Sequence, residues 1–178
     1  MNNTQRSNTQ KLVRGAMIAA VYTAVSLALA PLSFSAVQVR FAEALCLLPV
    51  LCPEAVWGVT LGCLLTNLLG SVPLDAVFGT LATLIAALAA YKLRHLRWKG
   101  LPLAAAFCPV VVNAVIVGAE ITFFFMDGPA TGAILAMNMF TVGLGEVISC
   151  VVLGCALVRL IEKNGALLQL FGKLQADR

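Results

Sequence analysis

The sequence predicts an all-α integral membrane protein, built as a bundle of six transmembrane helices with both termini in the cytoplasm. Of its 178 residues, 61% are apolar and 11% are charged, whereas a soluble domain is about 45–50% apolar and about 25% charged. The apolar residues form runs near the length of about 20 residues that a membrane-crossing helix needs. The basic residues gather at the start, in one loop and at the end, which is typical of cytoplasmic segments. Soluble, disordered and disulfide-rich secreted classes are therefore excluded.

The first half of the chain contains three predicted helices. Lys11–Pro31 is the first span, because Pro31 cannot continue a helix. A loop follows to residue 39, and a short apolar stretch from about Arg40 to Leu51 is the second helix. Pro53–Leu69 is the third, since proline is tolerated in a first helical turn and Glu54 beside it is favoured by the helix dipole.

Three further helices are predicted in the second half. Leu74–Tyr91 is the fourth, and Pro102 opens a fifth that reaches about residue 125. The last apolar region, residues 130–161, would measure roughly 48 Å as one helix, against a hydrocarbon core of about 30 Å. The part before Asn138 is therefore predicted to be a loop or an interfacial segment, and Asn138 opens the sixth span.

The distribution of basic residues supports a count of six helices. An even number of spans places both termini on one side, and the basic loop at residues 92–99 then falls on that side too. Arg40 is the only basic residue left outside. The predicted organisation is a cytoplasmic tail at residues 1–10, a membrane domain at 11–163 and a second cytoplasmic tail at 164–178.

The polar residues of the spans predict a ligand site near the outer face. Counted at about 1.5 Å per residue from the cytoplasmic boundaries, they fall in the outer half of the bundle, above an inner half of small and aliphatic residues. This pattern suits a cup closed beneath, rather than a channel with polar groups along its full depth. Carboxylates outnumber the single arginine, which favours a ligand that is cationic or rich in hydrogen-bond donors. The candidate substrate-binding residues are Gln38, Arg40, Glu43, Asn67, Asp75, Asn113, Glu120, Asn138 and Glu146.

Several of these residues also have structural interpretations. Arg40 and Glu43 are three apart and can form a helical ion pair, and Asp75 suits a first helical turn. The asparagines can bridge helices. Glu146 is different, because it lies well inside an apolar helix without a nearby partner in sequence, and a functional role is favoured there.

No catalytic or metal-ligating set is expected. His95 is the only histidine, and it lies among basic loop residues. The six cysteines fall inside apolar runs without a C-x-x-C pair, so they are interpreted as small buried apolar side chains.

The first span carries a stripe of small residues. Alanine recurs at every fourth position, at Ala16, Ala20, Ala24 and Ala28. Such a stripe allows another helix to approach closely. It serves either packing inside the bundle or docking to a separate membrane protein.

Several segments together resemble the QueT family, the substrate-binding (S) components of energy-coupling factor (ECF) transporters assigned to queuosine precursors. The likeness covers roughly residues 11–163, and its most specific block is Gln38-Val-Arg40-Phe-Ala-Glu43-Ala-Leu45. The other segments are Ala30-Pro-Leu-Ser33, Asn67-Leu-Leu-Gly70, Leu74 to Thr83 and Val142-Gly-Leu-Gly-Glu146.

This resemblance implies an ECF S-component bundle of six helices that binds 7-aminomethyl-7-deazaguanine or queuine. It also implies that an A-x-x-x-A surface on the first helix, here matched at Ala16 and Ala20, docks a transmembrane coupling subunit joined to two ATPases. A carboxylate would accept the N–H and amino groups of the guanine-like edge, and a second carboxylate would meet the aminomethyl cation. Glu146 or Glu120 is expected at one end of the ligand, and Glu43 or Asp75 at the other.

No cofactor is expected in this chain, because it has no Walker A pattern; ATP and Mg²⁺ would serve the partner ATPases. Three alternatives stay open. One is an S component for another vitamin or nucleobase, one is an intramembrane enzyme that uses paired carboxylates, and one is an assembly factor without a small ligand.

Overall fold

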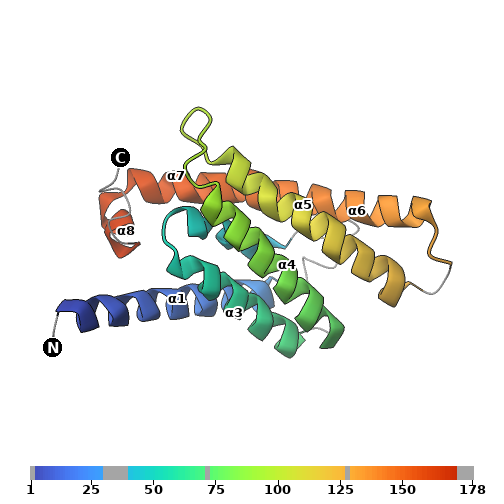
Figure 1. The fold of residues 1–178 in the computed structure, drawn as a ribbon, viewed down its shortest axis with the longest axis horizontal. Helices are drawn as coiled ribbons and strands as arrows, with labels where there is room; N and C mark the ends of the chain where they lie inside the picture. Colours follow the sequence, from blue (N-terminus) through green and yellow to red (C-terminus); the bar gives the residue numbers. More distant parts are fainter. Residues whose placement is uncertain (1–2, 30–39, 71–72, 127–128, 172–178) are drawn as a thin grey trace.

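The protein is helical throughout the residues that its computed structural model describes, which are 3–29, 40–70, 73–126 and 129–171, with side chains from residue 8 onward. Within these ranges no strand forms, and a single isolated bridge pairs Trp98 with Leu101. The predicted all-α class is therefore confirmed. The elements in chain order are α1 (Asn3–Ala28), η1 (Phe41–Val50), α3 (Glu54–Gly70), α4 (Pro73–Lys92), α5 (Leu103–Glu120), η2 (Ile121–Phe125), α6 (Gly132–Glu146), η3 (Val147–Gly154), α7 (Cys155–Lys163) and α8 (Gly165–Leu170). Figure 1 shows their arrangement.

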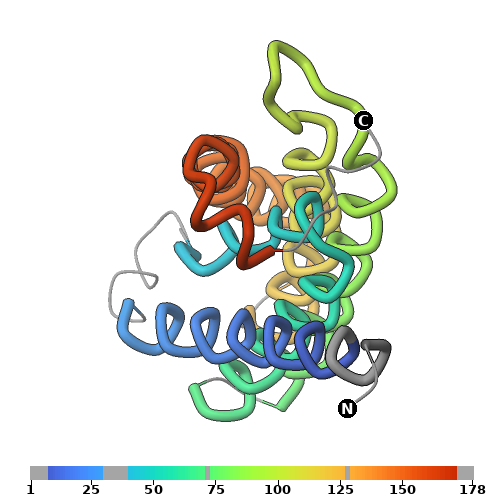
Figure 2. Tube along the Cα trace, turned by 90° about the vertical axis from the view of Figure 1, so that its left-hand side faces the viewer, coloured from blue at the N-terminus to red at the C-terminus, as the bar shows by residue number. Residues whose placement is uncertain are grey.

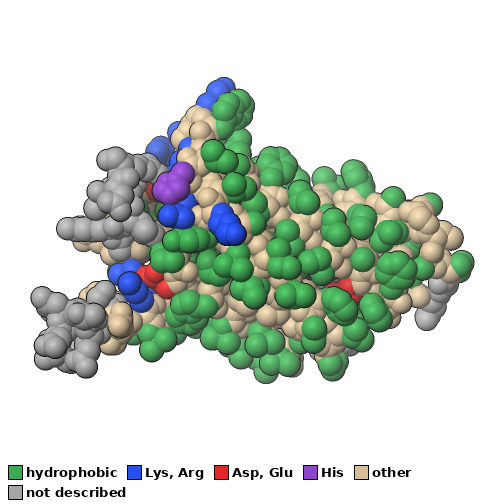
Figure 3. All heavy atoms as spheres, viewed as in Figure 1, with side chains coloured by type: hydrophobic (Ala, Val, Ile, Leu, Met, Phe, Trp, Pro, Cys, Tyr) green, Lys and Arg blue, Asp and Glu red, His purple; other side chains and the backbone are tan. Residues whose placement is uncertain are grey.

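Four helical stretches are long and apolar enough to cross a membrane. They are Asn8–Ala28, Pro73–Lys92, Leu103–Phe125 and Gly132–Lys163, and two shorter apolar helices, η1 and α3, accompany them. Apolar side chains cover most of the face in Figure 3, whereas Lys, Arg and His gather at one end. An apolar band beside a basic end is what a multi-pass membrane protein presents to lipid and cytoplasm.

Helices α1 and α3 run side by side in the same direction. Gly15 of α1 lies against Trp57 of α3, and Gly62 of α3 lies against Tyr22 further along α1. The chain must therefore run back from the C-terminal end of α1 to the N-terminal end of α3, and η1 forms this return segment. It is a 3₁₀ helix of 10 residues, or roughly 20 Å. Arg40, just before η1, contacts Asn67 near the C-terminal end of α3. The C-terminal end of η1 leads into Glu54, the first residue of α3. η1 therefore runs antiparallel to α3. Figure 2 shows η1, in cyan, inside the bundle.

Close contact between α1 and α3 depends on glycine. A Cβ atom at Gly62 would lie 2.7 Å from Tyr22 Cβ and 3.0 Å from the Ala19 carbonyl oxygen. A Cβ atom at Gly143, by contrast, would meet only Ala114 Cβ at 3.5 Å, an ordinary contact.

We expect Gly62→Ala to destabilise the protein by about 1–3 kcal/mol, because the added methyl group must push α1 away from α3. Gly143→Ala is the matched control, and it should be neutral or slightly stabilising, because alanine is the better helix former. Thermal unfolding in detergent would compare the two variants. Equal midpoints would show that α1 and α3 do not need this close approach.

The remaining helices pack in antiparallel order along the chain. Thr83 of α4 donates a hydrogen bond to Cys63 of α3, and α4 packs on α5. Gly118 near the end of α5 lies against Met139 of α6. As a result, α3, α4, α5 and α6 each contact the next helix in sequence, whereas α1 and α3 are parallel neighbours with η1 between them in the sequence.

The basic segments lie together at one end of the bundle. Arg14 of α1 forms an ion pair with Glu54 of α3 and also donates to the Phe171 carbonyl oxygen beside α8. Arg97, in the loop between α4 and α5, forms an ion pair with Glu162 of α7 at 2.7 Å. That loop turns through Lys99 and Gly100, both with positive φ. The three predicted cytoplasmic segments therefore share one end, although residues 3–10 and 165–170 are helical rather than simple tails.

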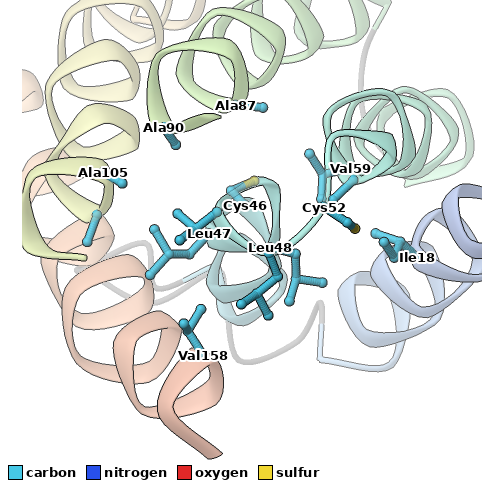
Figure 4. Close-up of a cluster of buried hydrophobic side chains, with 14 of the residues drawn as sticks. Ile18, Cys46, Leu47, Leu48, Cys52, Val59, Ala87, Ala90, Ala105 and Val158 are labelled. Carbon is cyan, nitrogen blue, oxygen red and sulfur yellow. The ribbon is translucent and has the colours of Figure 1, made fainter. Parts of the chain in front are cut away.

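A hydrophobic core fills the half of the bundle nearest this basic end. Figure 4 shows Leu47 and Leu48 of η1 in contact with residues from α1, α3, α4, α5 and α7. Leu47 and Cys46 are fully buried. The second predicted helix thus exists as η1, but it is buried among the other helices instead of facing lipid along its length.

Of the two alternatives predicted for the residues before Asn138, a loop or an interfacial segment, the loop is wrong. The structure places no loop before Asn138, because α6 begins at Gly132 and the helix continues to Lys163, over 32 residues. The Thr131 side chain caps it by accepting from the Ile134 N–H group. The length limit applies only to the part of a helix inside lipid, and this helix extends past its neighbours at the basic end, where α7 carries Glu162 and Lys163.

Candidate functional site

Two buried carboxylates from opposite parts of the chain meet in the interior. Glu43 of η1 is fully buried, and Glu146 at the end of α6 is 3% exposed. One oxygen of each carboxylate and the Cys150 sulfur all lie within 4.8 Å of one another. The sequence places these two residues 103 positions apart (146 − 43), so only the tertiary fold brings them together.

Every oxygen of this pair lies within hydrogen-bonding distance of a donor of the chain, although the single Cys150 S–H lies 3.2 Å from both Glu146 Oε2 and the Glu43 carbonyl oxygen. Glu43 Oε1 accepts from the Tyr22 hydroxyl at 2.7 Å, and Oε2 accepts from the Cys46 thiol at 2.8 Å. Glu146 Oε1 accepts from Asn113 Nδ2 at 2.9 Å, and the Cys150 Sγ atom lies 3.2 Å from Oε2. These buried groups, which we call the central cluster, are Tyr22, Glu43, Cys46, Asn113, Glu146 and Cys150.

Glu146 and Cys150 are four residues apart, about one helical turn, and both side chains are buried. They flank the start of η3, a π-helix of 8 residues. Single π-turns inside α-helices are rare and concentrate at functional sites. Ser149, on the same stretch, is fully buried as well.

Arg40, Asn67 and Asp75 form a second polar group. Arg40 Nη2 donates to Asn67 Oδ1 at 3.3 Å, and Asn67 Nδ2 donates to the Asp75 carbonyl oxygen at 2.9 Å. Electrostatic interactions join Arg40 to Glu43 and Asp75. Among the described residues no salt bridge at hydrogen-bonding distance joins Arg40 to Glu43, which was the structural alternative for this pair. Arg40 instead donates to α3 and lies close to the central cluster.

Glu120 is at the C-terminal end of α5, and Asn138 is in the N-terminal half of α6, which packs against that end of α5. Glu120 is 2% exposed, and its charged neighbours are Asp75 and Arg40. Asn138 is half-buried, and its Nδ2 atom donates to the Thr122 hydroxyl at 2.9 Å. Asn138 therefore joins α6 to η2, and no hydrogen bond of its side chain reaches the central cluster in the part of the chain described. Gln38 lies outside the described residues.

Three members of the central cluster were missed by the sequence analysis. Cys46 and Cys150 were interpreted only as apolar side chains, yet both thiols lie within hydrogen-bonding distance of carboxylate oxygens. Tyr22 carries the one phenol group in the predicted first span, and a polar group in an apolar helix was a usable signal.

Glu43, Glu146 and Cys150 also have the donor types and spacing of a metal site. Mixed carboxylate and thiolate ligands suit a borderline ion such as Zn²⁺. These carboxylates, however, already accept hydrogen bonds from Tyr22, Cys46 and Asn113, so the chain itself supplies partners for them. The donor set therefore fits a hydrogen-bonded cluster better than a ready metal site.

The alanine stripe faces away from the bundle. Ala16, Ala20, Ala24 and Ala28 are all exposed. Helix α1 packs on α3 through its opposite side, with Ile18, Ala19 and Tyr22 buried. The stripe therefore takes no part in the α1–α3 contact, which removes internal packing as its main explanation.

The model of the QueT transporter family matches residues 12–163, which include every element from α1 to α7 apart from the first turns of α1. The chain belongs to the QueT transporter family. No curated protein and no solved structure matches the chain. This QueT transporter chain is a multi-pass membrane protein with a role in membrane transport, and both the apolar helices and the buried polar clusters agree with that role.

Proposed function

We propose that this QueT chain is the substrate-capture subunit of an ECF-type ATP-driven importer and binds a queuosine precursor, 7-aminomethyl-7-deazaguanine or queuine. One observation carries the proposal: Glu43, Glu120 and Glu146 are all buried in the interior, above the apolar core that fills the basic end. Carboxylates facing lipid would have argued against a binding site. Buried carboxylates that converge between helices are the usual mark of a substrate site in a membrane protein.

The charge balance of the site suits a cationic ligand. The central cluster holds two carboxylates, and Arg40 is the basic side chain that interacts electrostatically with them among the described residues. An aminomethyl cation near Glu43 and Glu146 would offset their mutual repulsion. The amide groups of Asn67 and Asn113 supply further donors and acceptors for the polar edge of a purine-like base.

The proposed topology has six passes, with both termini and the basic loop in the cytoplasm. The parallel α1 and α3 require a return through η1, and the antiparallel order of the later helices adds three more passes. All three basic segments then lie on one side of the membrane, as the positive-inside rule requires. The ligand would enter from the opposite, extracellular side.

The importer would require partners that this chain does not supply. We propose that the exposed alanine stripe docks a transmembrane coupling subunit, which in turn joins two ATPases that use ATP and Mg²⁺. The chain itself would need no cofactor, because capture involves only binding. The stripe supports this proposal because it is smooth, exposed and unused by the α1–α3 contact.

A ligand panel on the purified protein tests the proposed function. We expect 7-aminomethyl-7-deazaguanine or queuine to raise the unfolding midpoint, since a ligand at 100 times its Kd stabilises the folded state by about 2.7 kcal/mol. Riboflavin, thiamine, adenine and guanine serve as comparison ligands. Stabilisation by one of these alone would identify a different cargo, and no stabilisation by either deazaguanine would contradict the proposal.

A further inference from the structure

Glu120 is a buried carboxylate that accepts no hydrogen bond from the described residues. It is the last residue of α5 and is 2% exposed, and within residues 8–29, 40–70, 73–126 and 129–171 neither Oε1 nor Oε2 has a hydrogen-bond partner. The other buried glutamates of the described residues all accept hydrogen bonds: Glu43 from Tyr22 and Cys46, Glu54 from Arg14, and Glu146 from Asn113. Glu120 is therefore the exception among them.

An unpartnered buried carboxylate is unfavourable, because it has lost its water and gained no donor in exchange. The charged neighbours of Glu120 do not supply one. Asp75 carries the same charge, and the hydrogen bond that Arg40 makes through Nη2 goes to Asn67. An ionised carboxylate can only accept, so the missing groups must be hydrogen-bond donors. Two adjacent acceptor oxygens best fit a ligand that presents two donors side by side.

The position of Glu120 relative to the central cluster matches the length of one small ligand. Glu120 follows Asn113 by seven residues on α5 (120 − 113), which is about two helical turns and about 10 Å along the same helix face. Asn113 donates to Glu146. A bicyclic base with a short cationic arm can therefore place its arm near Glu146 and its far edge near Glu120.

We infer that Glu120 binds the guanine-like edge of the ligand, accepting hydrogen bonds from its ring N–H and its 2-amino group, while Arg40 donates to the adjacent 6-oxo oxygen. This inference rests on the proposed function, and it assigns the ends of the ligand. Glu120 reads the 2-amino-6-oxo edge, and Glu43 with Glu146 meets the aminomethyl cation. The site would then select heterocycles with that edge over those that lack the 2-amino group.

The first test pairs a ligand change with a residue change. Wild-type protein should bind 7-aminomethyl-7-deazaguanine at least 30-fold more tightly than the analogue without the 2-amino group. Glu120→Gln should lower the affinity for the complete ligand by about 100-fold, the size expected when charge-assisted hydrogen bonds in a buried site are lost. In the same variant the two ligands should bind nearly equally. Glu162→Gln, at the basic end, is the matched control and should retain wild-type affinity.

The second test needs no ligand. Because Glu120 has no hydrogen-bond partner among the described residues, Glu120→Gln should raise the unfolding midpoint of the ligand-free protein, whereas Glu146→Gln should lower it by disturbing bonds to Asn113 and Cys150. A lower midpoint for Glu120→Gln would show that the carboxylate stabilises the fold, and would overturn the inference.

The outcomes separate this inference from the proposed function. If the wild-type protein binds neither deazaguanine, the proposed function fails. If the wild type binds the complete ligand but Glu120→Gln binds it equally well, or still distinguishes the analogue without the 2-amino group, the assignment of Glu120 is wrong and the proposed function stands.

Discussion

Ala20→Trp should abolish co-purification of the QueT chain with the coupling subunit and its ATPases, while ligand binding by the isolated chain stays at the wild-type level. Ala20 is exposed near the centre of the alanine stripe, so an indole ring there lies away from the α1–α3 contact, which uses Ile18, Ala19 and Tyr22. It would, however, hold a docking helix several ångströms away, and close approach is what such stripes provide. Affinity purification from cells that express all subunits measures assembly, and calorimetry on the purified chain measures binding.

Ala156→Trp is the matched control for this experiment. Ala156 is an equally exposed alanine, but it lies on α7, on the far side of the bundle from α1 in Figure 1. The control should assemble normally. Assembly of Ala20→Trp at wild-type levels would exclude the stripe as the docking surface, and loss of ligand binding together with assembly would indicate a folding defect instead.

Glu146→Gln should weaken binding of 7-aminomethyl-7-deazaguanine by about 30-fold, or about 2 kcal/mol, because the variant removes a negative charge from the carboxylate pair that faces the ligand cation. Affinity for the neutral 7-cyano analogue should change much less. The variant should still fold, at a lower unfolding midpoint, because the glutamine oxygen remains an acceptor while its NH₂ group replaces the second acceptor oxygen of the carboxylate.

Isothermal titration with both ligands measures this difference directly. Equal losses for the charged and the neutral ligand would place Glu146 away from the aminomethyl group. Unchanged affinity for both would remove Glu146 from the site, and the central cluster would then serve only to join η1, α5 and α6.

The positions of the buried carboxylates were predictable from sequence, and their partners were not. Counting residues from the basic ends placed Glu43, Glu120 and Glu146 away from the cytoplasmic boundary, because helical rise is nearly constant. Which group bonds to which carboxylate depends on helix rotation and neighbours. Tyr22 reaches Glu43 across 21 residues, and Asn113 reaches Glu146 across 33. No local pattern in the sequence encodes those pairings.

For the alanine stripe too, the sequence predicted the feature but not its role. Its period of four residues was visible in the sequence, but the period serves internal packing and docking equally well. The structure decides for an outward orientation, because Gly58 and Gly62 draw α3 onto the other side of α1. For the last helix, a length argument predicted a loop or an interfacial segment before Asn138. The loop is wrong, because Thr131 caps a helix that continues to Lys163.

Composition and charge by themselves determined that this chain is a helical membrane protein with its basic segments on one side, because transfer of each side chain into lipid is a local property that adds along the chain. The tertiary structure alone decided that η1 is buried, that Glu43 and Glu146 share one cluster with two thiols, and that Glu120 is left without a donor. The physical reason is that hydrogen bonds act over about 3 Å, so they depend on the register and rotation of helices that glycine contacts set far away in sequence.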